Sequence, residues 1–180
     1  MIEITIPAFE LWDEEKQEFY SCKETVLRLE HSLVSLSKWE SKWHKPFLSK
    51  GAKTEEETID YIKCMTLTQN TDPIVFKFIT NENINKISKY IEDPMTATTF
   101  SNNQNNKSSR EIITSELIYY WMIALNIPFE CQKWHLNRLL TLINVCNIKN
   151  QPPKKMSKKE LMSRNAALNA ARRQQLNTKG

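Results

Sequence analysis

The sequence predicts a mainly α-helical fold with a small N-terminal antiparallel β element and a basic C-terminal helical extension. Residues 2–6 and 25–29 alternate apolar and polar side chains, as strands with one buried face do. Beyond Ser32, apolar residues recur at spacings of three and four, which is the period of a helix with one buried side. The Pro152-Pro153 pair then interrupts the helical pattern ahead of a segment rich in lysine and arginine.

Charge divides the chain at the same place. Residues 154–180, which we call the C-terminal arm, carry a formal charge of about +7, and the remainder of the 180 residues carries about −3. The arm's bases are Lys154, Lys155, Lys158, Lys159, Arg164, Arg172, Arg173 and Lys179, and its one acid is Glu160. We expect a mainly helical globular domain with an N-terminal β-hairpin at 1–150, a linker at 151–156 and a basic C-terminal helix or tail at 157–180.

Three helices are expected before residue 100. The first follows Ser32 and has five residues at helical spacing, namely Leu33, Leu36, Trp39, Glu40 and Trp43. The second, at 55–69, begins with the capping-box pair Thr54 and Glu57. Its inward side is expected to be formed by Ile59, Ile62 and Met65, with Tyr61 less central. The third is a short amphipathic helix at 83–92, whereas residues 74–79 fit either a strand or a helical turn.

Two further helices are expected to form the centre of the core. Residues 94–110 are rich in Asn, Ser, Thr and Pro and predict a loop. Ser108 and Glu111 have the spacing of a capping box ahead of a helix at 112–126, which is apolar nearly all round. A helix without a polar side is usually central, so we expect it to pair with a helix at 130–148 as a helical hairpin.

The composition argues against nucleotide-binding enzymes that use glycine-rich loops, and against a membrane protein. The only glycines are Gly51 and Gly180, whereas phosphate-binding loops need several. No stretch reaches the roughly 18 consecutive apolar residues of a membrane span, and no signal peptide is visible. We therefore expect a cytosolic protein whose cysteines are buried thiols: Cys22, Cys64, Cys131 and Cys146.

Two candidate sites have simpler explanations. Cys131 and His135 would share a helix face as metal ligands, but a lone pair is more typical of a core thiol beside a hydrogen-bonded imidazole. Glu30-His31-Ser32 contains the residue types of a hydrolytic triad, but sequence neighbours rarely point at one another. We expect no catalytic site, no metal and no cofactor.

Two basic segments remain as candidates for binding. In residues 38–45, lysines interleave with tryptophans, which favours either nucleic-acid binding or, more simply, a packed helix whose lysines extend from its edges. The arm has a third capping box, Ser157 and Glu160, and few apolar residues. We expect it to dock on a partner through Lys154, Lys155, Lys158, Lys159, Leu161, Met162, Arg164, Leu168, Arg172 and Arg173; nucleic-acid binding and simple solubility are the alternatives.

Six stretches are considered together: LEHSL at 29–33, SKWESKW at 37–43, YIKCMT at 61–66, ITSELIYYWM at 113–122, WHLNRLL at 134–140 and NAARR at 169–173. They resemble a group of small proteins of tailed bacteriophages from the tail gene module, where tail assembly chaperones are found. The resemblance implies a non-enzymatic factor in the host cell cytoplasm that binds the tape measure and tail-tube proteins and is absent from the finished virion. It transfers no active-site residues.

Two other functions stay open on the sequence. One is a structural virion component, such as a connector or tail completion protein, in which the arm is ordered only after assembly. The other is a nucleic-acid-binding protein that uses Lys38, Lys42, Arg172 and Arg173, whose affinity would fall steeply with salt. A homo-oligomer is compatible with each of them.

Overall fold

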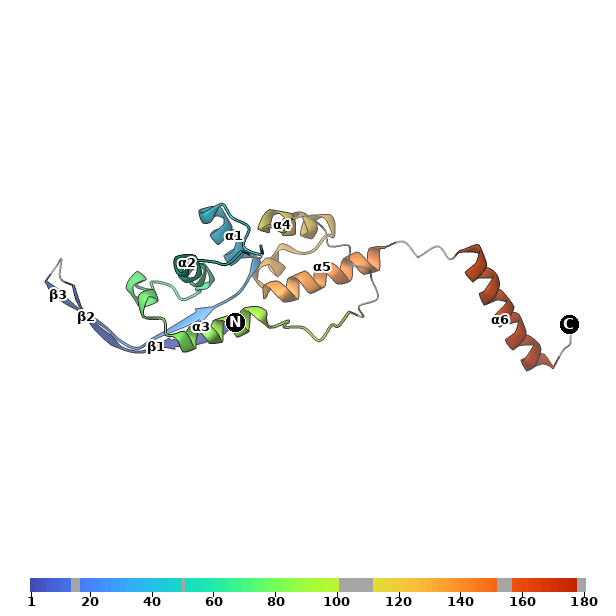
Figure 1. Ribbon diagram of the computed structural model, residues 1–180, viewed down its shortest axis with the longest axis horizontal. Helices are drawn as coiled ribbons and strands as arrows, with labels where there is room; N and C mark the ends of the chain where they lie inside the picture. Colours follow the sequence, from blue (N-terminus) through green and yellow to red (C-terminus); the bar gives the residue numbers. More distant parts are fainter. Residues whose placement is uncertain (14–16, 50, 101–111, 152–156, 178–180) are drawn as a thin grey trace. The chain divides into compact units, whose positions relative to one another are not determined.

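The structure is a computed structural model, shown in Figure 1, and it confirms the mainly helical fold with a small N-terminal β element. It describes residues 1–13, 17–49, 51–100, 112–151 and 157–177. The chain divides into two compact units, Met1–Asn147 and Ile148–Gly180. The first unit contains the strands and most of the helices, and the second contains the C-terminal helix.

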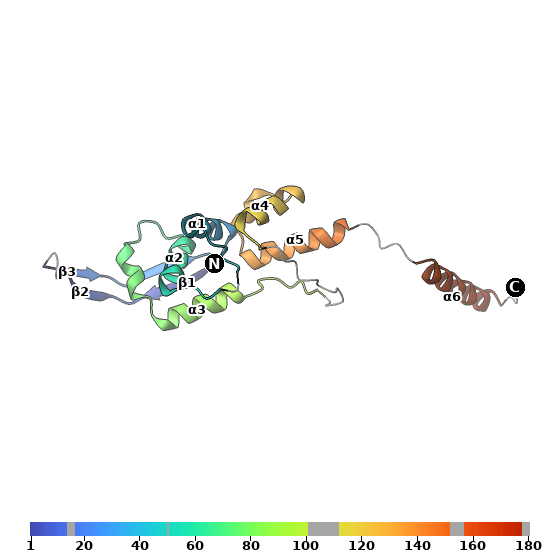
Figure 2. The same ribbon diagram turned by 45° about the horizontal axis from the view of Figure 1, so that its top comes forward.

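The N-terminal β element consists of two antiparallel pairs in succession. β1 (Ile2–Ile6) pairs with β4 (Thr25–Leu29), with Ile4 opposite Leu27. Alternate side chains of this pair are buried, as the sequence pattern predicts. Between them, β2 (Phe9–Asp13) and β3 (Glu18–Cys22) form a ribbon that extends away from the helices of the first unit (Figures 1 and 2).

The inner pair is covered on both edges, whereas the outer ribbon is not. Beside β4, the Leu67 N–H donates to the Arg28 carbonyl at 2.8 Å, and the Glu30 N–H donates to the Met65 carbonyl at 2.9 Å. Beside β1, the Asn83 side chain of α3 donates to the Thr5 carbonyl at 3.0 Å. In the part of the chain that the structure describes, β2 and β3 have no strand neighbour except each other.

The helices follow the predicted order with shifted ends. They are α1 (Leu33–Trp43), α2 (Glu55–Met65), the 3-10 helix η1 (Pro73–Phe78), α3 (Asn81–Glu92), α4 (Ser115–Ala124), the 3-10 helix η2 (Phe129–Lys133), α5 (Leu136–Asn150) and α6 (Lys158–Leu176). The predicted capping boxes at Thr54 and Ser157 are both formed. The one at Ser108 and Glu111 lies outside the described residues, and Thr114 caps α4 instead.

Two details of α2 differ from the prediction. The helix ends at Met65, before the predicted Gln69, because Thr66 turns to pair with Leu29 of β4. Tyr61 was expected off centre but is buried, whereas Ile59 is only half-buried. Tyr61 packs in the core because its ring stacks on Phe47 with centroids 3.9 Å apart, and its hydroxyl has a hydrogen-bond partner in His31.

The predicted central hairpin of residues 112–126 and 130–148 is wrong. The central helix is α1, which packs against α2, α4 and η2. α4 buries only one side, through Ile118 and Met122, and leaves Tyr120 and Ile123 exposed by 63% and 61%. The second helix starts at Leu136 because His135 first pairs in extended form with Ser32, and the Leu136 N–H donates to the His31 carbonyl at 2.7 Å.

Candidate functional site

The predicted partner-binding residues lie on α6, except two. Lys154 and Lys155 are outside the described residues. The other eight are Lys158, Lys159, Leu161, Met162, Arg164, Leu168, Arg172 and Arg173, and all of them are exposed. The Ser157 hydroxyl accepts from the Glu160 N–H at 3.2 Å, and the Glu160 carboxylate accepts from the Ser157 N–H at 2.9 Å, so the helix has a complete N-terminal cap.

The helical period places five of these residues on two sides of α6. Leu161 and Leu168, seven residues apart, lie on one side, and Arg172 follows one turn later. Met162 and Arg173, eleven residues apart, share another side. Each side therefore combines an exposed apolar side chain with a cation near the helix C-terminus, where the helix dipole favours positive charge.

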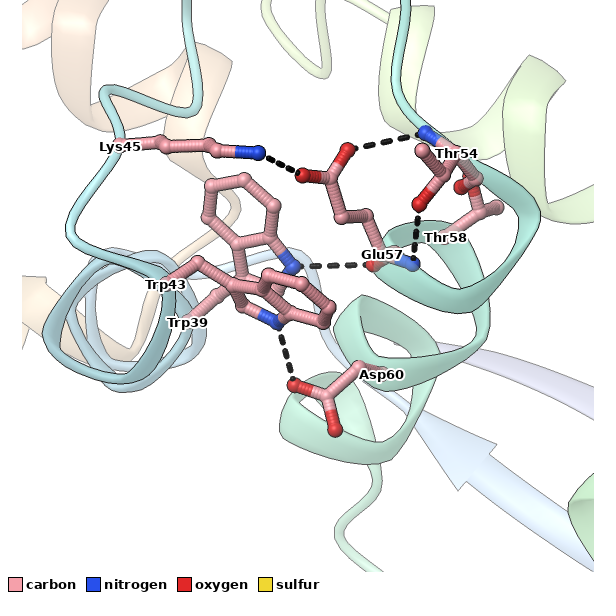
Figure 3. Close-up of polar contacts among 7 residues, drawn as sticks. All are labelled: Trp39, Trp43, Lys45, Thr54, Glu57, Thr58 and Asp60. Carbon is pink, nitrogen blue, oxygen red and sulfur yellow. Dashed lines mark hydrogen bonds and ion pairs between the residues drawn. The ribbon is translucent and has the colours of Figure 1, made fainter.

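The two tryptophans of the row at residues 38–45 pack between α1 and α2 (Figure 3). The Trp39 indole N–H donates to the Glu57 carbonyl at 2.9 Å, and that of Trp43 donates to the Asp60 carboxylate at 2.9 Å. Trp39 is fully buried, and the two indole rings stack with centroids 6.1 Å apart. The packing interpretation of this row is confirmed.

Two lysines of the row are paired with acids on α2. Lys45 binds Glu57 and Lys42 binds Asp60. The hydrogen bonds from Lys45 and from the Thr54 N–H hold the pKa of Glu57 below its ordinary value. Burial acts to raise the pKa of Asp60, but the hydrogen bonds from Lys42 and Trp43 outweigh it and lower that pKa. Both acids are thus ionised at neutral pH, and Lys42, one of the four cations named for nucleic-acid binding, is paired with Asp60.

Glu40 is a buried carboxylate that joins three segments, and the sequence pattern gave its place on the helix but not this role. One oxygen accepts from the Phe47 N–H at 2.8 Å, and the other accepts from the Ser115 N–H at 2.7 Å. The second contact satisfies a first-turn amide of α4. The sequence did contain a signal for this role, because Glu40 is next to Trp39 on the apolar side of α1. A buried carboxylate is stable there only with hydrogen-bond donors.

Glu30, His31 and Ser32 have separate partners and form no triad. The Tyr90 hydroxyl donates to Glu30 at 2.6 Å, and Ser32 caps α1 by accepting from the Ser35 N–H at 3.3 Å. The buried imidazole of His31 is 2.5 Å from the Tyr61 hydroxyl through its Nδ1 atom. Burial, with the neighbouring His135, lowers the pKa of His31 to about 3, so this imidazole is neutral near pH 7.

Cys131 and His135 do not share a helix face, which corrects that prediction. Cys131 lies in η2, and His135 precedes α5. The Nδ1 atom of His135 accepts from the Asn137 N–H at 3.3 Å, which makes Nε2 the donor to the Tyr90 carbonyl at 3.0 Å. Both ring nitrogens are thus occupied within the chain. Among the described residues, no three His, Cys, Asp or Glu side chains gather as a metal site requires.

The cysteines are all free, but only Cys131 is fully buried. Cys22, Cys64 and Cys146 are half-buried, which corrects the expectation that all four are core thiols. Burial raises the pKa of the thiols of Cys64 and Cys131, so both are protonated at neutral pH and weak as nucleophiles.

Within the described ranges, none of the helices combines the length and the hydropathy that crossing a bilayer demands. No protein-family model matches this chain, and no curated protein and no solved structure is significantly similar to it.

Proposed function

We propose that this chain is a non-enzymatic protein-binding factor that docks on another protein through α6. The observation that carries the proposal is that α6 has a complete N-terminal cap and 19 residues, none of them buried. Nucleation of an isolated helix is unfavourable, and most helical stability in proteins comes from packing of an apolar side. A capped helix with exposed Leu161 and Leu168 is therefore suited to gain its stability by packing against a partner.

The charges of α6 select the kind of partner. Exposed ion pairs contribute only about 0–1 kcal/mol each, so the cations orient the helix, and the apolar contacts provide most of the affinity. Arg172 and Arg173 lie in or near the last turn on different sides. A partner with an apolar seam bordered by acids would contact leucine and arginine side chains together.

Together with the sequence resemblance, these features support the role of a phage tail assembly chaperone. Its partners would be the tape measure and tail-tube proteins, bound in the host cell cytoplasm. A long helical protein exposes apolar stripes until tube subunits surround it. A helix with exposed leucines and cations that binds reversibly is suited to shield those stripes during assembly.

Co-expression with the tape measure protein of the same phage tests this function. The double substitution Leu161→Ser and Leu168→Ser should move that protein from the soluble to the insoluble fraction. The matched control is Met95→Ser with Leu67→Ser, since both residues are exposed on the first unit. If the tape measure protein is equally soluble with and without this chain, the chaperone function is refuted.

A structural virion component is the second candidate, and the exposed side of α4 favours it. Tyr120 and Ile123 form an apolar surface on a helix of the compact unit, as subunits that pack into a particle often do. Quantitative mass spectrometry of purified virions separates the two functions. A fixed copy number per particle would support the structural role, and absence from particles would support the chaperone.

A further inference from the structure

A partly enclosed pocket lies on the first unit, among residues of α1, α2 and η2, and we call it the α1–α2 pocket. Its lining is mostly apolar and includes Val34 of α1 with Cys64 and Met65 of α2. Its volume is about 270 Å³. Pockets for drug-sized molecules measure roughly 300–1,000 Å³, so this pocket suits a smaller molecule or a single amino-acid residue.

Two lysines from different elements line the same pocket. Lys38 is on α1, and Lys133 is the last residue of η2. Unlike Lys42 and Lys45, neither of them has an ion-pair or hydrogen-bond partner in the part of the chain that the structure describes. Two unpaired cations beside an apolar lining favour a ligand that has both a negative charge and an apolar part.

Glu30 is the acid among the described lining residues, and its charge is compensated within the chain. One carboxylate oxygen accepts from the Tyr90 hydroxyl at 2.6 Å, and the other is 2.7 Å from the amino group of Met1. Because both oxygens have partners, Glu30 does not neutralise the two lysines. The α1–α2 pocket therefore keeps an excess of positive charge, which excludes a cationic ligand.

Ser32 adds a hydroxyl group to the lining, at the N-terminus of α1. The residue is only 6% exposed, and its Oγ atom accepts from the Ser35 N–H at 3.3 Å. Its hydroxyl hydrogen has no acceptor among the described residues, so it is available to donate to an anion in the pocket. The helix dipole of α1 favours negative charge at the same end.

We propose that the α1–α2 pocket binds a small carboxylate with an apolar part, such as a short aliphatic acid. The apolar part packs on Val34 and Met65, and the carboxylate is bound by Lys38, Lys133 and Ser32. The C-terminal residue of another polypeptide has the same chemistry when its side chain is apolar. This inference goes beyond the proposed function and does not depend on α6.

Alkylation of Cys64 in the purified full chain measures occupancy of the pocket, because this half-buried thiol is part of the lining. Burial raises the pKa of the Cys64 thiol, so the reaction with iodoacetamide is run at mildly alkaline pH to supply thiolate. Hexanoate and N-acetyl-leucine should each slow the reaction severalfold at saturation. Cys22 and Cys146 are also half-buried, and mass spectrometry of the same sample should show no change in their alkylation.

Three further probes test the chemistry of the ligand. Hexylamine has the apolar part with the opposite charge, N-acetyl-leucinamide has the apolar part without charge, and inorganic phosphate has charge without an apolar part. None of the three should protect Cys64. Tighter binding of N-acetyl-leucine than of hexanoate would assign the pocket to a polypeptide C-terminus, and the reverse order would assign it to a free aliphatic acid.

Removal of the two cations is the second experiment. Lys38→Gln with Lys133→Gln should weaken hexanoate binding about fivefold, as the loss of two exposed ion pairs implies. The matched control is Lys77→Gln with Lys89→Gln, which removes two exposed lysines of the first unit that do not line the pocket. Proton–nitrogen NMR spectra verify folding and report binding through the amides of residues 32–38. If hexanoate neither protects Cys64 nor shifts these amides at high millimolar concentration, or if hexylamine binds equally well, the proposal is overturned.

Discussion

The helices α1 and α6 begin with the same kind of cap but differ in how much they bury. Ser32 and Ser157 each cap their helix through a complete capping box. The 11 residues of α1 then bury Leu33, Leu36 and Trp39, whereas the 19 residues of α6 bury nothing. A cap specifies where a helix starts. Whether the helix packs into the core depends on how many apolar residues it presents on one side.

The largest difference should appear when one leucine is removed from each helix. Leu36→Ala leaves a cavity in the core and should lower the free energy of unfolding by about 2–5 kcal/mol. Leu168→Ala truncates an exposed side chain and should change that free energy by less than about 0.5 kcal/mol. Urea unfolding followed by tryptophan fluorescence measures both. Equal losses would mean that α6 is part of the folding unit.

The second-largest loss of unfolding free energy is expected at Glu40, the buried carboxylate of α1. Glu40→Ala removes the acceptor of two buried N–H groups, those of Phe47 and Ser115, and should lower the free energy of unfolding by about 2–4 kcal/mol. Glu116→Ala, on the exposed side of α4, is the control and should have a small effect. If Glu40→Ala is as mild as its control, water replaces the carboxylate and the bridge between α1 and α4 is not structural.

His31 should make the first unit sensitive to acid. Its pKa is about 3 in the fold and about 6.5 when unfolded, so below pH 6.5 the unfolded chain binds a proton that the fold does not. The stability contributed by the neutral imidazole is complete above pH 6.5 and is lost by about 1.4 kcal/mol per pH unit as pH falls toward 3.

The dependence of unfolding free energy on pH, measured between pH 7 and 5, tests this effect. His31→Asn should be less stable at pH 7, because the contact with Tyr61 is lost, but should show a flatter slope. The matched control is His44→Asn, because His44 is exposed and Asn accepts its positive φ of 51°. An unchanged slope in His31→Asn would assign the acid sensitivity to other groups.

The helices and the inner strands could be predicted because local signals agree there. Thr54 with Glu57 and Ser157 with Glu160 mark helix starts by hydrogen bonds within four residues. The alternation in residues 2–6 and 25–29 identifies β1 and β4 because each has one buried face.

The long-range arrangement could not be predicted from the same signals. An apolar helix such as α4 can be central or can expose a binding surface, and only its packing on α1 decides. The roles of Glu40 and His31 depend on partners 75 and 30 residues away in the chain. For the arm, the sequence predicted the helix itself, whereas its partner is a proposal that rests on the exposed leucines and cations of α6.

The N-terminal caps of α1 and α6 can be compared most directly, and their removal should have the smallest effects on stability. Ser32→Ala should lower the free energy of unfolding of the first unit by about 1 kcal/mol, because the cap of α1 is part of the core. Ser157→Ala removes an equivalent cap from α6 and should leave that free energy unchanged.

The second substitution should instead be visible in amide hydrogen exchange over residues 158–176, which should become about fivefold faster, as a loss of about 1 kcal/mol implies. Asn169→Gln, in the middle of α6, is the control, because a long polar residue retains the helix. Bound to a partner, the wild-type helix should exchange more slowly, and Ser157→Ala should bind more weakly because more of the helix must then order on binding. Slow exchange of α6 in the isolated chain, unaffected by Ser157→Ala, would show that the helix is already held by contacts within that chain.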